Sequence, residues 1–387
     1  MRHGWLLAGI LWAVANAGTG PVQAAPVTAQ SLQKALDEAV AGLPTSPGIS
    51  VRVLAPRYGI DWRAASGMAN PAAGTPLSPD NPFRIASVTK AFVGAGILRL
   101  MEDGRLTLSQ HIAALVSDDT RRLLLSAGYD PHRITVRQLM DHTSGLRDYY
   151  DDPAYEEAMF ADPHRRWTRQ EQLAIAMKVG SGYGEPGERF HYVDTGYNIL
   201  GEIVERMTGL PMGPALRHLL DYDRLGLHAT WLESLEPVPS GVKPRSHQFV
   251  GAIDMTDADP SYDLYGGGGL VSTLDDLTRF FRAIFRGDVF RDPATLPAGL
   301  TITVAEDGDG YMLRARPALF TPERAGPHAC LGLGGYYGTL VVHCPGIDLT
   351  VGFNANTADP ESFGVAEDFI NKVGAALGTA PVPIPGP

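Results

Sequence analysis

The sequence predicts an α+β fold in which both ends of the chain build one antiparallel sheet, flanked by helices, and a mostly helical region is inserted between them. Two strand-like runs lie near the N-terminus, "GISVRVLAP" and "GIDWRAASG". Further runs return near the C-terminus: "LTITVA", "CLGLGG", "TLVVHC" and "IDLTVGFNAN". Between about 106 and 260 the pattern is mostly helical. Strands at both ends with helices between them place the two ends in one sheet.

The individual elements follow from periodicity and end signals. "TAQSLQKALDEAVAGL" has helical periodicity, with Ser31 as the expected cap. The first two strand runs are separated by "RY" and predict a hairpin. "RIASVTKAFVGAGILRLMEDG" leads into a strongly apolar helix, and "GGGGLVSTLDDLTRFFRAIF" predicts a flexible glycine loop before an amphipathic helix capped by Ser272 or Thr273. "PESFGVAEDFINKVGAALG" closes the fold as a helix.

The N-terminus has the features of an export signal. Arg2 and His3 precede an apolar stretch, 5–15, and small-residue cleavage sites end at Ala17 and Ala24. The stretch is shorter than the ~20 residues that a membrane-spanning helix needs. We therefore expect a signal peptide over 1–24, a single domain over 25–378 with a helical subdomain at about 106–260, and a proline-rich tail over 379–387. The mature protein is then periplasmic or secreted, without an integral membrane span; an uncleaved anchor is the alternative.

Composition narrows the classes of function. The 387 residues carry a formal net charge of −11, which argues against nucleic acid or an anionic membrane as a partner. The sequence has no His-Glu-x-x-His, metal-spaced Cys/His cluster or phosphate-binding glycine motif, so it indicates neither a metal nor an organic cofactor. Cys330 and Cys344 flank an expected hairpin near Tyr337, where they would form a cross-strand disulfide or remain free thiols.

Ser-x-x-Lys occurs three times, and one occurrence is suited to chemistry. Ser31 to Lys34 lies on the first helix, where the serine serves better as a cap, and Ser240 to Lys243 lies in a loop before a proline. Ser87 and Lys90 instead begin the apolar helix, one turn apart on one face. The positive end of that helix and its free N–H groups would lie near the serine. A Gly-x-Ser-x-Gly elbow is missing from the sequence, which argues against an α/β-hydrolase.

Four segments, taken in their order along the chain, indicate a resemblance to a known family. "FRIASVTKAF", "ITVRQLMDHTSGLRDY", "GERFHYVDTGYNILGEIVERMTG" and "GGGGLVSTLDDLTRF" resemble the serine β-lactamase and DD-peptidase superfamily, in particular its branch of class C β-lactamases, D-Ala-D-Ala carboxypeptidases and esterases. The resemblance covers about 31–377 and implies the β-lactamase/transpeptidase-like fold. It also implies that Ser87 is the acylated nucleophile, that Lys90 accepts its proton and that Tyr192 shuttles protons.

The resemblance further implies the third motif of the family and its oxyanion hole. That motif falls on Leu333 to Gly335, followed by Tyr336. The backbone N–H groups of Ser87 and Tyr336 would form the oxyanion hole. The segment "HTSG", which begins at His142, is interpreted as a structural landmark. Burial of Lys90 would lower its pKa from the ordinary ~10.4 and help it act as a base.

Two positions depart from the family pattern. Asp194 replaces the asparagine of the family's Tyr-x-Asn, and Leu333 replaces its lysine or histidine. Both changes move the local charge toward negative, so a substrate with a free carboxylate should bind less well, an effect that Asn356 would offset in part. Asp194 beside Lys90 would also raise the pKa of the lysine unless the aspartate is held elsewhere. A neutral ester, or an amide whose free ammonium Asp194 could bind, suits such a site better.

These observations predict an exported serine hydrolase that works through an acyl-enzyme on an ester or a D-amino-acid peptide or amide. A D-Ala-D-Ala carboxypeptidase or a class C-like β-lactamase is the alternative within the same class. A non-catalytic protein resembling the penicillin-binding proteins is the alternative from another class. The expected partner is a small molecule or peptide, with cell-wall fragments among the candidates.

Overall fold

One antiparallel sheet is built from both ends of the chain, as predicted. The computed structural model describes residues 28–300 and 330–377. Six strands pair in the order β3-β2-β1-β11-β10-β9. Their bounds are β1 Gly48–Ala55, β2 Ile60–Asn70, β3 Thr75–Pro76, β9 Leu331–Gly335, β10 Thr339–Cys344 and β11 Leu349–Asn354. The signal peptide, the tail and nearly all of "LTITVA" lie outside the described residues.

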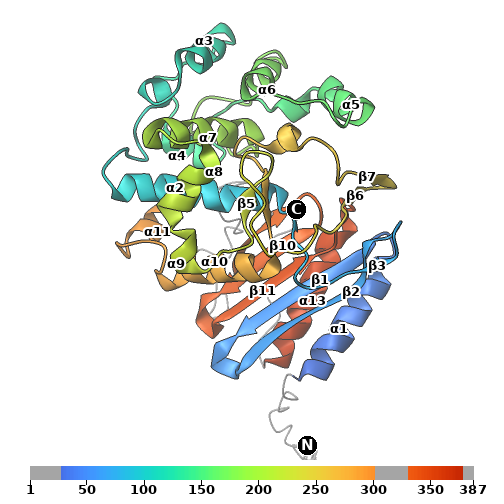
Figure 1. Cartoon of the computed structure of the whole chain (residues 1–387). Helices are drawn as coiled ribbons and strands as arrows, with labels where there is room; N and C mark the ends of the chain where they lie inside the picture. The colour runs from blue at the N-terminus through green and yellow to red at the C-terminus, as the bar shows by residue number, and fades with distance from the viewer. Residues whose placement is uncertain (1–27, 301–329, 378–387) are drawn as a thin grey trace, which may run out of the picture.

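Each face of this sheet is covered by helices. Alternate residues of β1, Ile49, Val51 and Val53, are buried in a core with α1 (Ala29–Gly42) and α13 (Glu361–Ala376), which lie side by side (Figure 1). The opposite face packs on α10 (Leu274–Arg286). The period-two alternation of a strand explains why one run of residues can serve both faces.

A second core lies mainly among helices and extends to Leu333, Tyr337 and Val341 of the β9–β10 hairpin. Its central helix α2 (Thr89–Glu102) is buried from residue 89 to residue 100, as expected for a helix that is apolar on all sides. The surrounding helices appear in the upper half of Figure 1. They are α3 Asp118–Ser126, α4 Val136–Met140, α5 Pro153–Ala161, α6 Arg169–Ala176, α7 Asp194–Thr208, α8 Met212–Leu220, α9 Tyr222–Leu225 and α11 Thr295–Gly299.

Short strands form two small sheets in addition to the six-stranded sheet. β4 (Phe83–Arg84), β8 (Leu270–Ser272) and β5 (Trp231–Leu232) form a three-stranded sheet. β6 (Phe249–Val250) pairs with β7 (Ile253–Asp254). β4 runs directly into the short 3-10 helix η2 (Ala86–Val88) and then into α2. The position of the Ser87 turn is therefore fixed by a strand on one side and a buried helix on the other.

Two helix caps differ in detail from the sequence prediction. The first helix is capped by Thr28, and Ser31 is the third helical residue, whose hydroxyl accepts from the backbone N–H of Thr28. The prediction that Ser31 is the cap is therefore wrong, because Thr28 and Ser31 form a capping box together. Of the two candidates before α10, Thr273 is the cap.

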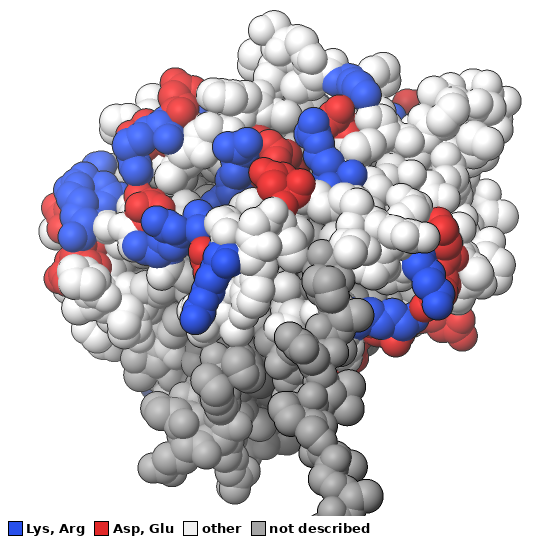
Figure 2. Space-filling model, turned by 90° about the horizontal axis from the view of Figure 1, so that it is seen from below, with Lys and Arg blue, Asp and Glu red and all other residues white. Residues whose placement is uncertain are grey.

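The β9–β10 hairpin carries a disulfide between Cys330 and Cys344. Within residues 28–300 and 330–377, no helix is long and apolar enough to cross a bilayer. Figure 2 shows lysine and arginine side chains beside aspartate and glutamate on one face of the molecule, without a separate basic patch there.

Candidate active site

The three side chains proposed for catalysis meet at the η2 turn. The Lys90 ammonium donates to Ser87 Oγ at 3.0 Å, and the Tyr192 hydroxyl donates to the same oxygen at 2.8 Å. Ser87 comes from the turn, Lys90 from the first turn of α2, and Tyr192 from the segment just before α7. The structure thus brings together residues separated by 105 positions in the chain.

The turn that carries Ser87 is held in an uncommon backbone conformation. Ala86 has φ +44°, in the left-handed region that residues other than glycine seldom adopt. Gly335 presses on this turn from β9, because a Cβ atom there would collide with the carbonyl oxygen of Ile85. Because β9 approaches the turn so closely, Tyr336 and Ser87 line the same cavity. An oxyanion hole formed by their amides stays a prediction.

Lys90 is completely buried and paired. Its ammonium forms an ion pair with Asp194 and donates to the carbonyl oxygen of Gly267 at 2.8 Å. Burial lowers the pKa of Lys90, but attraction to Asp194 and Tyr192 outweighs burial, and the pKa is raised above its ordinary value. Burial alone was expected to lower the pKa of this lysine. Because the aspartate is not held elsewhere, Lys90 keeps its proton at neutral pH.

Tyr192 is neutral at physiological pH. Burial raises the pKa of its phenol to about 12, although the nearby Lys90 charge opposes the increase. The ring stacks on His142 with centroids 4.5 Å apart, and His142 Nδ1 accepts from the backbone N–H of Val193 at 3.2 Å. His142 therefore supports the segment that carries the tyrosine, in keeping with a structural interpretation of "HTSG".

The glycine run was interpreted as a flexible loop, and this interpretation is wrong. A Cβ atom at Gly267 would press on Asp194 at 3.2 Å, and one at Gly268 would collide with the carboxylate of Asp263. The flanking glycines, Gly266 and Gly269, have φ +130° and +100° and are equally crowded. The four glycines are therefore tightly packed, and the carbonyl oxygen of Gly267 contacts Lys90.

A cavity of about 360 Å³ opens in front of Ser87. Its lining is largely aromatic and apolar, and it includes Asp194, Leu333, Gly335 and Tyr336, whose role in substrate binding stays a prediction. The cavity is also lined by Tyr150, Glu156, Met159, Met255, Tyr262, Asp263 and Tyr337. Leu333 is almost fully buried, and none of the described residues that line the cavity is a lysine or an arginine that could bind a substrate carboxylate.

Asn356 does not reach the cavity. Its side chain is completely buried, and its Oδ1 accepts from Ser246 Oγ at 2.9 Å and from Asn354 Nδ2 at 2.7 Å. Its backbone has φ +55° and joins the loop after β11 to β6. This placement corrects the expectation that Asn356 helps to bind a substrate, because the side chain is used within the fold.

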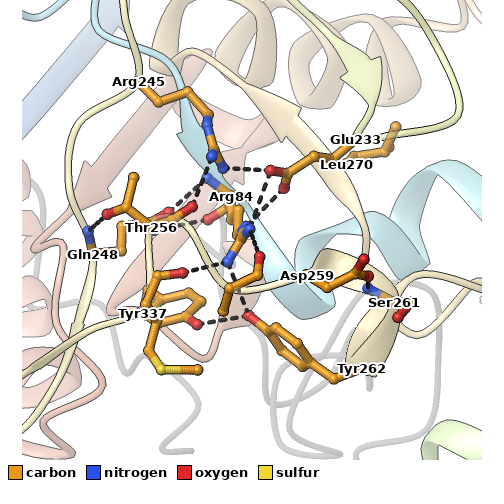
Figure 3. Close-up of polar contacts among 12 residues, drawn as sticks. Arg84, Glu233, Arg245, Gln248, Thr256, Asp259, Ser261, Tyr262, Leu270 and Tyr337 are labelled. Carbon is orange, nitrogen blue, oxygen red and sulfur yellow. Dashed lines mark hydrogen bonds and ion pairs between the residues drawn. The ribbon is translucent and has the colours of Figure 1, made fainter. Parts of the chain in front are cut away.

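A second buried cation, Arg84, lies at the centre of a network of polar contacts (Figure 3). The Arg84 guanidinium forms a bidentate ion pair with the Glu233 carboxylate, with N–O distances of 2.7 and 3.1 Å. It also donates to the carbonyl oxygens of Met255 at 2.7 Å and Ala258 at 2.6 Å. This network fixes the 255–263 segment, which contributes Met255, Tyr262 and Asp263 to the cavity.

Sequence reasoning missed both Arg84 and Asp263. Arg84 stands in the segment "FRIASVTKAF" but was given no role there, and Asp263 lies outside the segments that suggested the family. The contacts of Arg84 with Glu233 and Met255 join segments more than 140 positions apart, which the sequence alone does not show. Four consecutive glycines were the available signal, since such a run often marks a close approach of backbone to other groups.

Comparisons with known proteins identify the family of the chain. The Beta-lactamase family model matches residues 36–375. Esterase EstB of Burkholderia gladioli is 28% identical over 350 residues, which cover 80% of this chain and 86% of the esterase. Penicillin-binding protein 4* of Bacillus subtilis is 27% identical over 274 residues, 65% of this chain and 56% of that protein.

Solved structures show the same fold. D-amino acid amidase from Ochrobactrum anthropi SV3, complexed with D-phenylalanine, superposes with a TM-score of 0.72 at 23% identity, over 90% of this chain and 98% of the amidase. The chain belongs to the Beta-lactamase family. It is a serine hydrolase with the β-lactamase/transpeptidase-like fold, as the sequence predicted.

Proposed function

We propose that this hydrolase works through an acyl-enzyme on Ser87. Ser87 Oγ attacks the carbonyl carbon, its proton passes to the Lys90–Tyr192 pair, and that proton then reaches the departing alcohol or amine. Water attacks the acyl group in turn, releasing the acid and restoring the Ser87 hydroxyl. The observation that carries the proposal is the pair of hydrogen bonds from Lys90 and Tyr192 to one serine oxygen beside a cavity.

The ion pair with Asp194 determines when the proton can be accepted. A protonated Lys90 and a neutral Tyr192 both donate to Ser87, so neither is a base in that state. The form that lacks one of these protons is the reactive form, and it is scarce at neutral pH because Asp194 raises the pKa of Lys90. Activity should therefore increase with pH above neutrality.

The proposed substrate is an ester or a D-amino-acid peptide or amide. Support comes from the cavity wall, where Leu333 stands in place of a cation and Asp194 adds a negative charge. A penicillin or a D-Ala-D-Ala terminus carries a free carboxylate that this wall would repel, so a β-lactamase or carboxypeptidase activity is less favoured. An esterase and a D-amino acid amidase among the similar proteins are consistent with this choice.

Export to the periplasm or medium is part of the proposal. It rests on the sequence of residues 1–24, which has the pattern of a cleaved signal peptide. The Cys330–Cys344 disulfide is in keeping with an oxidising compartment. Cell-wall peptides with D-amino acids would be available there.

Intact mass spectrometry tests the proposal. The protein is incubated separately with a fluorophosphonate, an activated ester and benzylpenicillin, with Ser87→Ala as the matched control. We expect adducts with the first two reagents, located on the peptide that contains Ser87 and lost in the control. Adducts with all three would favour the cell-wall or β-lactam role, and adducts retained in Ser87→Ala would contradict the assignment of the nucleophile.

A further inference from the structure

Asp263 is a carboxylate at the cavity that the chemistry described above does not use. It ends the 3-10 helix η5 (Pro260–Asp263) and borders the same cavity as Ser87. Within residues 28–300 and 330–377, its carboxylate has no hydrogen bond and no ion pair, although Lys90 and Arg84 attract it from a distance. An unpaired carboxylate in such a place costs free energy unless it binds a proton or a cation.

The position of Asp263 is close to the reacting atoms. The Gly267 carbonyl accepts from Lys90 at 2.8 Å, and Lys90 donates to Ser87 at 3.0 Å. The next residue, Gly268, lies directly against the Asp263 carboxylate and leaves no room for a Cβ atom. Asp263 therefore lies beside the residues that contact Lys90, and it lines the same cavity as Ser87, into which an acyl group would extend.

The charges around the cavity favour a cationic substituent. Lys90 is already paired with Asp194, whose backbone N–H donates to the buried Asp148. Burial raises the pKa of Asp263 to about 7, and repulsion by Asp194 adds to this effect, although Lys90 and Arg84 oppose it. Three carboxylates, Asp148, Asp194 and Asp263, thus lie within electrostatic reach of Lys90, which forms its ion pair with Asp194. A second cation, brought by the substrate, would be attracted and would keep Asp263 ionised.

We propose that Asp263 binds the free α-ammonium of an aminoacyl ester or amide, with the side chain of the substrate against Met159, Met255 and Tyr150. This inference rests on the proposed function, because it assumes that Ser87 is acylated. It names the specificity-determining residue of the site and a substrate class, unblocked aminoacyl compounds. Asp194 is less suited to this role, because its carboxylate is held by Lys90.

A pair of matched esters tests the assignment. D-phenylalanine methyl ester carries the ammonium, and methyl 3-phenylpropanoate is the same ester without it. The readout is the ratio of kcat/KM for the two esters. Asp263→Asn keeps the shape of the side chain and should reduce this ratio about 10- to 100-fold, as expected for the loss of a charged hydrogen bond. Glu156→Gln removes the exposed carboxylate at the rim of the same cavity and should change the ratio by less than about 3-fold.

The outcomes separate this inference from the proposed function. Equal losses on both esters, or an unchanged ratio in Asp263→Asn, would overturn the role of Asp263 while the hydrolase activity stands. An equal decrease of the ratio in Glu156→Gln would also overturn it, since it would show a general effect of charge. Wild-type protein that hydrolyses neither ester and takes no fluorophosphonate on Ser87 would contradict the proposed function instead. Thermal melting of each variant checks that it is folded.

Discussion

Two buried cations lie at equal distances in sequence from Ser87, and they differ in what they do. Arg84 precedes the serine by three residues and Lys90 follows it by three. Each is at least nine-tenths buried and each is paired with one carboxylate, Glu233 or Asp194. The Arg84 guanidinium also donates to the carbonyl oxygens of Met255 and Ala258 and to the Tyr262 hydroxyl. Lys90 makes one of its hydrogen bonds to the Ser87 hydroxyl.

The difference follows from the chemistry of the two side chains. A guanidinium stays charged and offers a rigid set of donors, so Arg84 is suited to joining segments. An ammonium has one nitrogen that can lose a proton, and its pKa responds to its surroundings. The comparison indicates that burial with a carboxylate makes one cation a structural support and the other a titratable group at the reaction centre.

Replacing Lys90 by methionine should mainly reduce activity, whereas replacing Arg84 by methionine should mainly reduce stability. Lys90→Met should reduce kcat/KM for an activated ester about 10²- to 10⁴-fold, the usual contribution of a positioned acid or base. Arg84→Met should reduce the free energy of unfolding by about 3 kcal/mol or more, because Glu233 and two carbonyl oxygens lose their buried donor. Urea denaturation and ester kinetics on both variants provide the measurements.

The matched control is Arg245→Met. Arg245 also contacts Glu233, at 2.7 Å, but is more exposed than Arg84. We expect a smaller loss of stability than in Arg84→Met. A Lys90→Met protein that stays active, or an Arg84→Met protein no less stable than the Arg245 variant, would contradict the division of roles.

A smaller effect is expected when the charge of the cavity wall is changed. Asp194→Asn combined with Leu333→His restores the polar types of the family pattern. It should be acylated by benzylpenicillin about 5-fold faster than Asp194→Asn combined with Leu333→Met, which corresponds to about 1 kcal/mol of electrostatic interaction. The rate is measured by intact mass over time. Asp194→Asn with Leu333→Met is the control, which keeps the wall apolar. Equal rates in the two double variants would remove the charge argument.

The fold was predictable because its signals are local. The alternation of Ile49, Val51 and Val53 indicates a strand with a buried face, and the spacing of Ser87 and Lys90 indicates one helix face. β1 pairs with β11 as expected from strands at both chain ends. Family resemblance added Tyr192, which contacts Ser87 as it implied.

The features that the sequence did not predict correctly depend on contacts between segments that are distant in the chain. Asn356 could not be assigned correctly from the sequence, because its hydrogen bonds to Ser246 and Asn354 are set by how loops pack. The same holds for Asp263, whose placement depends on the Arg84 network and on Gly268. The pKa of Lys90 follows from the balance of burial against attraction to Asp194, and that balance needs the geometry of the pair.

The pH dependence of Asp194→Asn tests the central claim, that the charge of Asp194 keeps Lys90 protonated and so limits the attack by Ser87. Removing this charge lowers the pKa of Lys90, and the free amine becomes more abundant at a given pH below that pKa. The measurement is kcat/KM for an activated neutral ester from pH 6 to 11, compared with wild type. We predict that the alkaline increase moves to lower pH by about one unit or more, with about a tenfold gain per unit near pH 7. A profile that stays in place, or moves to higher pH, would contradict the account.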